Sequence, residues 1–227
     1  MKTKTKLIVG IAVAVIVGLF AYNKVNAEES IGDFSLGYNS DLIFRGVGAD
    51  ESAIQSSIGL GTNVLGVDLD VGASVNIKDV GEDEVRLSAE TGVELLDTVN
   101  TSVGVVNYNN NHAIGDGTEL FISLGAEIIL SPEVKLFYNP SEAYVTTEGS
   151  ISHTVGLTEE ISVGAVGTVG NTTIGGDSGL YYGLDVIANY SLGDNTNAYI
   201  GINLQDLQDI NFETPELAFV AGVTHSF

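Results

Sequence analysis

Residues 215–227, PELAFVAGVTHSF, decide how the rest of the chain is interpreted. From Leu217 to Phe227 every second residue belongs to one mostly apolar series, whereas the residues between are small or mostly polar. Successive side chains of a β-strand point to opposite sides, so this period of two predicts a strand with one apolar face. The stretch ends on an aromatic residue of the apolar series, Phe227.

The same alternation recurs along the chain. We predict strands at about 33–46, 52–63, 66–78, 84–95, 98–108, 118–130, 133–139, 146–157, 160–170, 179–192, 197–205 and 216–227. Most are close to the ~9–11 residues of a tilted membrane strand, and long polar connections alternate with short ones. This pattern predicts an all-β fold, a transmembrane antiparallel up-and-down β-barrel of about twelve strands. A strand that ends on Phe227 resembles the closing strand of an outer-membrane barrel, which implies the barrel-insertion machinery as a partner.

A two-sheet sandwich would give the same alternation with its apolar side inward. Aromatic residues near strand ends favour the barrel, because about 8–10 residues of tilted strand span roughly 20–25 Å between two aromatic girdles. No such spacing is needed in a sandwich core. The predicted membrane-interface aromatics are Phe34, Phe44, Tyr182, Tyr190, Phe219 and Phe227.

The first residues predict export. Lys2, Lys4 and Lys6 precede an uncharged apolar run over residues 7–21, and Ala27 ends a segment of small residues suited to cleavage. We therefore predict a secretory signal peptide at residues 1–27 and one outer-membrane barrel domain at 28–227. An uncleaved anchor is the alternative, although the run is shorter than the ~20 residues that span a bilayer as a helix. The expected location is the outer membrane, in contact with its lipid.

Charge and cysteine content exclude some function classes. The chain carries 30 acidic and 8 basic residues, and removal of residues 1–27 would leave 4 basic residues, for a formal charge of 4 − 30 = −26. Nucleic acid is a poor partner for such a surface, because phosphate binding requires clustered Lys and Arg. The chain has no cysteine and hence no disulfide framework.

The sequence predicts no catalytic, metal or cofactor site. The three histidines, His112, His153 and His225, have no nucleophile on the same strand face two residues away. Acidic segments at 81–84 and 115–117 carry carboxylates that suit a divalent ion, but without a regular ligand spacing. Solvated acidic loops are the simpler interpretation, and we expect a protein that is not an enzyme.

The polar strand faces supply the candidates for lining the lumen. They are seven acids and three bases: Asp41, Arg45, Asp68, Asp70, Lys78, Arg86, Glu90, Glu94, Glu127 and Asp185. This excess of carboxylates predicts a passage that favours cations, although a network that merely ties strands together is an alternative. Nearly every strand also carries a glycine on this face, which suits either an open aqueous passage or relief of crowding in a small barrel.

One motif resembles a known family. Residues 37–61, GYNSDLIFRGVGADESAIQSSIGLG, are similar to the opening of the TorF-type porin family, in which a Phe-Arg-Gly step is followed by a loop and a Gln-led strand. Phe44, Arg45, Gly46 and Gln55 match that pattern, and residues 134–157 and the closing THSF follow the family's outline. Leu42 and Ile43 stand where the family usually has Tyr-Val. The resemblance implies an outer-membrane barrel of porin type.

Two functions fit these observations. The first is a porin-like channel that passes small hydrophilic solutes or ions and favours cations. The second is a non-conducting structural or surface-interaction barrel whose acidic loops bind cations. A polar lumen does not separate the two, because a plugged barrel is polar inside as well. The oligomeric state is left open.

Overall fold

The computed structural model describes residues 32–45, 47–64, 67–111, 115–141, 144–174, 177–208 and 216–227, so the predicted signal peptide and His112 lie outside the described residues. Every regular element in these ranges is a strand. The strands are β1 (Gly32–Asn39), β2 (Ile43–Phe44), β3 (Val47–Gly48), β4 (Ala53–Val64), β5 (Val67–Lys78), β6 (Glu84–Leu96), β7 (Val99–Asn111), β8 (Gly115–Ala126), β9 (Glu133–Asn139), β10 (Tyr144–Gly156), β11 (Ile161–Ile174), β12 (Asp177–Gly193), β13 (Thr196–Gln208) and β14 (Glu216–Ser226). No helix in these ranges is long and apolar enough to cross a bilayer.

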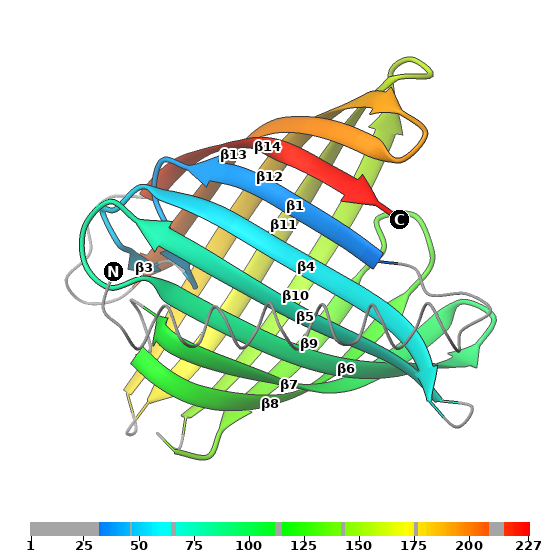
Figure 1. Ribbon diagram of the computed structural model, residues 1–227. Coiled ribbons are helices and arrows are strands. Elements are labelled where there is room, and N and C mark those ends of the chain that lie inside the picture. The colour runs from blue at the N-terminus through cyan, green and yellow to red at the C-terminus, as the bar shows by residue number, and fades with distance from the viewer. Residues whose placement is uncertain are drawn as a thin grey trace.

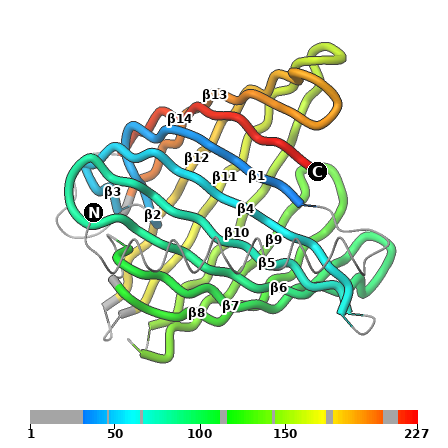
Figure 2. Tube along the Cα trace, in the orientation of Figure 1, coloured from blue at the N-terminus to red at the C-terminus, as the bar shows by residue number. Residues whose placement is uncertain are grey.

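Twelve of the strands form a closed barrel in the order β1-β14-β13-β12-β11-β10-β9-β8-β7-β6-β5-β4 (Figures 1 and 2). All neighbouring strands are antiparallel, and β1 closes the ring on β14 with Gly37 opposite Gly222. The closure extends to the last residue, because the Gly32 amide donates to the Phe227 carbonyl at 3.0 Å and the Phe227 amide donates back at 2.9 Å. Closure removes the unpaired edges of an open sheet. The predicted twelve-stranded antiparallel barrel is confirmed, and the sandwich alternative is excluded.

The apolar strand faces point outward. On β5 Val67 and Ile77 are about half exposed, whereas Asn76 on the opposite face is buried. Leu120, Ile122 and Leu124 of β8 are likewise half exposed. A barrel that turns its apolar side chains outward and its polar side chains inward has the polarity required of a wall surrounded by lipid.

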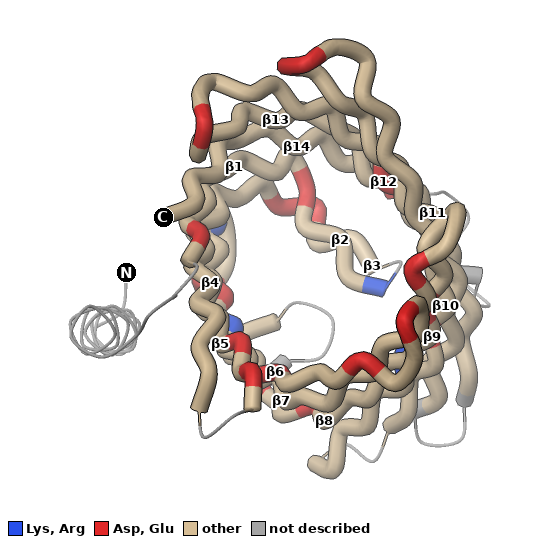
Figure 3. The backbone as a smooth tube through the Cα atoms, turned by 90° about the vertical axis from the view of Figure 1, so that its right-hand side faces the viewer, with Lys and Arg blue, Asp and Glu red and all other residues tan. Residues whose placement is uncertain are grey.

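Strand boundaries agree with most of the predicted segments. The predicted strand 118–130 runs too far, because β8 ends at Ala126 and a turn follows in which Leu130 and Ser131 have positive φ. The predicted strand 33–46 is too long, because the chain leaves the barrel wall after Asn39. The following segment forms β2 and β3, a two-stranded sheet separate from the barrel. Figure 3, a view along the barrel, shows this pair inside the ring of strands. We call residues 40–52, which include β2 and β3, the lumen hairpin.

Several inward glycines make room for aromatic rings on a neighbouring strand. A Cβ on Gly104 would lie 2.5 Å from the Phe121 ring, and one on Gly222 would lie 2.5 Å from the Tyr199 hydroxyl. A ring that covers a glycine on the adjacent strand is a known device for curving a sheet. Crowding therefore accounts for these glycines, whereas a Cβ on Gly156 would meet nothing within 4 Å.

Candidate functional site

The lumen hairpin is anchored at its base to the barrel wall. The Ser40 amide donates to the Phe219 carbonyl at 2.9 Å, and the Phe219 amide donates to Ser40 Oγ at 2.8 Å. Within the hairpin the Ala49 amide donates to the Leu42 carbonyl at 2.9 Å, and Asp41 Oδ1 accepts from the amides of Ala49 and Glu51. These bonds turn the chain inward, where sequence periodicity predicted a continuing strand.

Arg45 lies at the tip of the hairpin in a left-handed conformation, with φ of 51°. For a residue other than glycine this backbone conformation costs about 1–3 kcal/mol, so contacts around Arg45 must stabilise it. The strongest is a bidentate ion pair with Glu119 of β8, in which Nη1 lies 2.7 Å from Oε1 and Nη2 lies 3.2 Å from Oε2. The Tyr144 hydroxyl of β10 donates to the same carboxylate. We call Arg45, Glu119 and Tyr144 the latch.

The latch is shielded from water. The side chain of Arg45 is 9% exposed and that of Glu119 is 0% exposed. Burial by itself would lower the pKa of the Arg45 guanidinium, but the hydrogen bond and the charge of Glu119 raise it above its ordinary value. The Arg45 guanidinium therefore stays charged at any physiological pH.

Aromatic rings surround the tip. The Arg45 guanidinium carbon lies 4.7 Å from the centre of the Phe44 ring and 4.6 Å from that of Phe137. Phe44 meets Tyr108 of β7 edge to face, with ring centres 5.6 Å apart. The assignment of Phe44 to the membrane interface is therefore wrong, because Phe44 belongs to the hairpin and not to the wall. The motif Phe44-Arg45 instead docks on strands β7 to β10.

Sequence reasoning missed the partners of the latch. Glu119, Phe137 and Tyr144 were not among the predicted lumen residues, although they share a strand face with polar or small neighbours. An aromatic residue on the polar face of a barrel strand is the signal that was available. Tyr108 and Phe121 carry the same signal.

The two halves of the lumen differ in exposure. Toward the long connections, inward side chains are buried by the hairpin, including Glu119 at 0%, Tyr144 at 1% and Tyr108 at 3% exposure. Toward the short turns, the inward residues Asp68 and Asp70 are exposed although they stand inside the barrel. The hairpin therefore covers part of the inner wall at the long-connection end, whereas Asp68 and Asp70 near the short turns are accessible to water. We call the accessible part, lined by Asp68, Asp70, Glu90 and Glu94, the vestibule.

The vestibule concentrates negative charge on two adjacent strands. Asp70 of β5 stands directly opposite Glu90 of β6, a position in which like charges oppose pairing. Asp68 accepts a hydrogen bond from Asn63 Nδ2 at 2.8 Å, and Glu94 lies opposite Asn100. Water and salt around these exposed side chains weaken the repulsion between the neighbouring carboxylates.

The other predicted lumen residues are dispersed. Lys78 of β5 pairs with Glu51 at 3.4 Å, and Arg86 of β6 stacks on Tyr108 with its guanidinium carbon 5.6 Å from the ring centre. Asp185 lies on the inward face of β12. Asp41 and Arg45 belong to the lumen hairpin rather than to a wall strand, and Glu127 stands in the short turn after β8, where it accepts from Asn100 at 3.4 Å. Glu84, expected in an acidic loop, is instead a buried residue of β6.

Most predicted interface aromatics lie on the outer face. Phe34, Tyr190, Phe219 and Phe227 are each about half exposed, and Tyr182 of β12 is partly exposed. Their position outside the barrel is the one that a membrane interface requires. The interface role itself stays a prediction.

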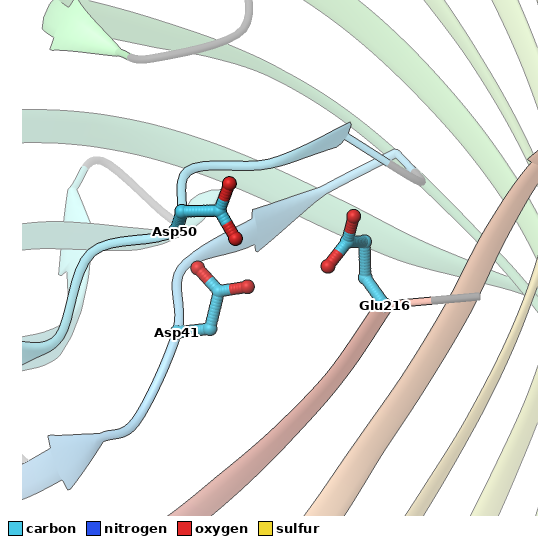
Figure 4. A group of neighbouring side chains, drawn as sticks. All are labelled: Asp41, Asp50 and Glu216. Carbon is cyan, nitrogen blue, oxygen red and sulfur yellow. The ribbon is translucent and has the colours of Figure 1, made fainter. Parts of the chain in front are cut away.

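Three carboxylates meet at the base of the hairpin. One oxygen each of Asp41, Asp50 and Glu216 lies within 4.8 Å of the others (Figure 4). Carboxylate oxygens are ligands for hard cations such as Ca²⁺. These residues come from distant parts of the chain, so no sequence motif marked them. They extend the negative charge of the barrel to the long-connection end.

A cavity of about 210 Å³ lies between the hairpin and the barrel wall. Its polar lining is dominated by the amide side chains of Asn39, Gln55, Asn76, Asn111 and Asn203. Asp41 and Glu84 add two acidic side chains, Arg86 adds one basic side chain, and Phe44 supplies an aromatic ring. We call this space the hairpin cavity.

Comparison with known proteins gives a fold but no family. No protein-family model matches the sequence, and no curated protein matches it significantly. Among solved structures, the NanC porin superposes with a TM-score of 0.57 at 12% identity, over 86% of this chain and 98% of that one. The KdgM porin gives 0.54 at 11% over 88% and 99%, and the COG4313 outer membrane channel from Pseudomonas putida F1 gives 0.56 at 10% over 87% and 95%.

These likenesses place the fold among porin-like outer-membrane β-barrels. At such low identity they show the fold alone. Membership of the TorF-type family therefore stays a prediction.

Proposed function

We propose that this chain is an outer-membrane channel that passes small hydrophilic solutes or ions and favours cations. The vestibule is the observation that carries the proposal. Its carboxylates are accessible to water inside a closed barrel, and fixed charge in a low-dielectric passage enriches ions of the opposite sign. The barrel fold, shared with structures described as porins and as an outer membrane channel, supports the same conclusion.

The lumen hairpin is the constriction of the proposed channel. It crosses from β1 and β14 to β8 and β10 and fills the lumen between them. A solute that enters through the vestibule therefore meets the hairpin before it reaches the long-connection end. The passage is narrow at this point, which restricts it to small solutes.

Reversal potentials across a planar bilayer in a KCl gradient test the proposal. The wild-type protein should be cation-selective, and Glu94→Lys should weaken that selectivity. Glu82→Lys is the matched control, because Glu82 is exposed in the connection between β5 and β6 and its charge is screened by salt. An anion-selective wild type, or selectivity that survives combined Glu90→Lys and Glu94→Lys, would contradict the vestibule's role.

A non-conducting barrel is the second candidate, and the buried latch favours it. A hairpin held by a shielded ion pair would close the lumen permanently and leave a structural or surface-interaction role. The two candidates differ in one measurement: a wild-type barrel without conductance that gains it when Arg45 is replaced would be a plugged barrel. Conductance by the wild type excludes this alternative.

The remaining assignments follow from the same proposal. The chain acts without catalysis, resides in the outer membrane in contact with lipid, and is inserted through the β14 strand that ends at Phe227. We also propose membership of the TorF-type family, because Phe44 and Arg45 of the matching motif form the hairpin tip and Gln55 lines the hairpin cavity. An alignment of that family should then show an acidic residue at the position of Glu119.

A further inference from the structure

We propose that the hairpin cavity is a binding site for a small uncharged polyol, of the size of a monosaccharide. This inference rests on the proposed channel and names the class of solute that its constriction binds. At about 30 Å³ per water molecule, the cavity of about 210 Å³ holds the equivalent of about seven waters. Pockets for drug-sized ligands measure about 300–1,000 Å³, so the smaller hairpin cavity suits a single monosaccharide unit.

Two amide oxygens at the cavity lack a protein partner. Asn76 is 8% exposed, and its Oδ1 has no hydrogen-bond partner among the described residues. The orientation of this amide is fixed, because its Nδ2 donates to Glu84 Oε1 at 3.4 Å and a carboxylate only accepts. Oδ1 of Asn203, across the cavity on β13, is likewise buried without a partner within the described ranges. Both residues line the cavity, so a small rotation of either side chain would bring its acceptor oxygen to a hydrogen-bond donor of a ligand.

The charged groups at the cavity are already engaged by the protein. Glu84 Oε1 accepts from Asn76 and from Asn111 Nδ2 at 3.3 Å, and Asp41 Oδ1 accepts two backbone amides. Arg86 stacks on a tyrosine ring. Because the cavity carries both signs of charge, an ion of either sign would meet a like charge there.

The remaining lining groups match hydroxyls. An amide side chain both donates and accepts, as does a hydroxyl group, so each can satisfy the other. Asn39 and Gln55 stand side by side on β1 and β4, with Nδ2 of the first 3.4 Å from Oε1 of the second. Phe44 offers an apolar ring to the C–H face of a sugar. An ammonium ion, in contrast, would satisfy only the acceptors.

The site lies within the proposed passage. Residues 41–44 of the lumen hairpin form one wall, and inward residues of β1, β4, β5, β6, β7, β13 and β14 form the others. The latch holds the hairpin wall in place, so the cavity depends on the Arg45–Glu119 pair.

Saturation-transfer NMR on the folded barrel in detergent tests the inference without requiring conductance. Three probes of similar size differ mainly in charge: neutral glucose, glucosamine with an ammonium group at C2, and glucuronate with a carboxylate at C6. Glucose should give the strongest and saturable transfer. Asn76→Ala and Asn203→Ala should each weaken glucose binding at least tenfold, whereas Asn189→Ala should leave it unchanged, because Asn189 lies on the inward face of β12 outside the cavity.

Heat-modifiable migration confirms that each variant is folded, and Asn203→Ala keeps the test decisive if Asn76→Ala does not fold. The inference is overturned if glucose gives no saturable transfer, if a charged sugar gives a stronger one, or if both variants bind glucose like the wild type. A conducting barrel with any of these results would leave the channel in place and remove the polyol site. Saturable glucose binding by a barrel without conductance would instead support the site and contradict the channel.

Discussion

Arg45 combines three features that rarely occur together. Its backbone is in the left-handed region, its guanidinium is bidentate with a fully buried carboxylate, and two aromatic rings flank it. The left-handed backbone and the buried charge each cost free energy. The desolvation cost of a buried ion pair is offset only when the geometry of the pair is good. Together they make the tip of the hairpin the best-fixed point inside the lumen.

Replacement of Arg45 should open the passage. Arg45→Gln leaves the Glu119 carboxylate buried without its cation, a change that costs about 3–5 kcal/mol when a buried pair loses one partner. The barrel wall is closed without the hairpin, so we expect the hairpin to undock and single-channel conductance to rise. Glu159→Gln is the control, because Glu159 is exposed in the turn between β10 and β11 and is not part of the latch. Unchanged conductance in Arg45→Gln would show that the latch does not set the constriction.

At the scale of elements, the packing of neighbouring strands depends on glycines that lie beneath large aromatic side chains. The Phe121 ring of β8 covers Gly104 of β7, and the carbonyl of Ala89 on β6 crowds the same position at 2.7 Å. The backbone cannot retreat from an added methyl group there, because strands on both sides hold it by ladder hydrogen bonds.

Gly104→Ala should therefore destabilise the barrel, by the ~1–3 kcal/mol typical of overpacking. Gly156→Ala is the matched control, because its Cβ would meet nothing within 4 Å. Urea unfolding, monitored through the loss of heat-modifiable migration on gels, measures the stability of both variants. Equal stability of the two variants would mean that the inward glycines are not needed for ring packing.

The closing strand supports a second element-scale prediction. Phe227 joins the ring through backbone bonds to Gly32, while its side chain is 45% exposed on the outside. Phe227→Ala should therefore leave the stability of the folded barrel nearly unchanged but reduce the amount assembled in cells. Phe219→Ala removes another outward aromatic ring, in β14 itself, and should assemble normally. Equal assembly of both variants would remove the proposed role of Phe227 in insertion.

At the scale of the whole molecule, the lumen is asymmetric along its axis. An acidic vestibule lies at the short-turn end, and the hairpin with its latch stands inside the barrel toward the other end. The carboxylates of Asp41, Asp50 and Glu216 add charge beyond the constriction. We therefore expect a charged solute to interact differently with the barrel when it enters from one side of the membrane or from the other.

A polyamine blocker detects this asymmetry. Spermine should reduce the cation current more strongly from the vestibule side than from the side of the long connections. The vestibule carboxylates stand inside the barrel, where low-dielectric walls focus their field, whereas salt screens the exposed acids of the long connections. Glu94→Lys should abolish the difference between the sides, which also identifies the orientation of the inserted barrel. Equal block from both sides would contradict a one-ended vestibule.

The closed barrel also predicts a simple solution behaviour. The purified protein should require detergent, show a β-type circular dichroism spectrum, and migrate differently on gels before and after heating. These properties follow from a complete ring of hydrogen-bonded strands with an apolar exterior. A protein that stays soluble without detergent would contradict the membrane assignment.

The sequence by itself determined the wall of this protein. Strand number, strand limits and the inward or outward direction of side chains follow from a period of two, which each strand carries in its own residues. The acidic character of the lumen followed as well, because Asp68, Asp70, Glu90 and Glu94 stand on the polar parity of their strands.

Only the tertiary structure decided what fills the lumen. Residues 40–45 continue the alternation of a strand, yet they turn inward because Arg45 gains a partner 74 residues away, in Glu119. The hairpin cavity likewise joins side chains from β1, β4 to β7, β13 and β14 that no local pattern connects. Periodicity in the sequence indicates the direction of a side chain relative to its own strand. The latch and the hairpin cavity depend instead on closure of the barrel, because closure brings strands that are distant in sequence face to face across one lumen.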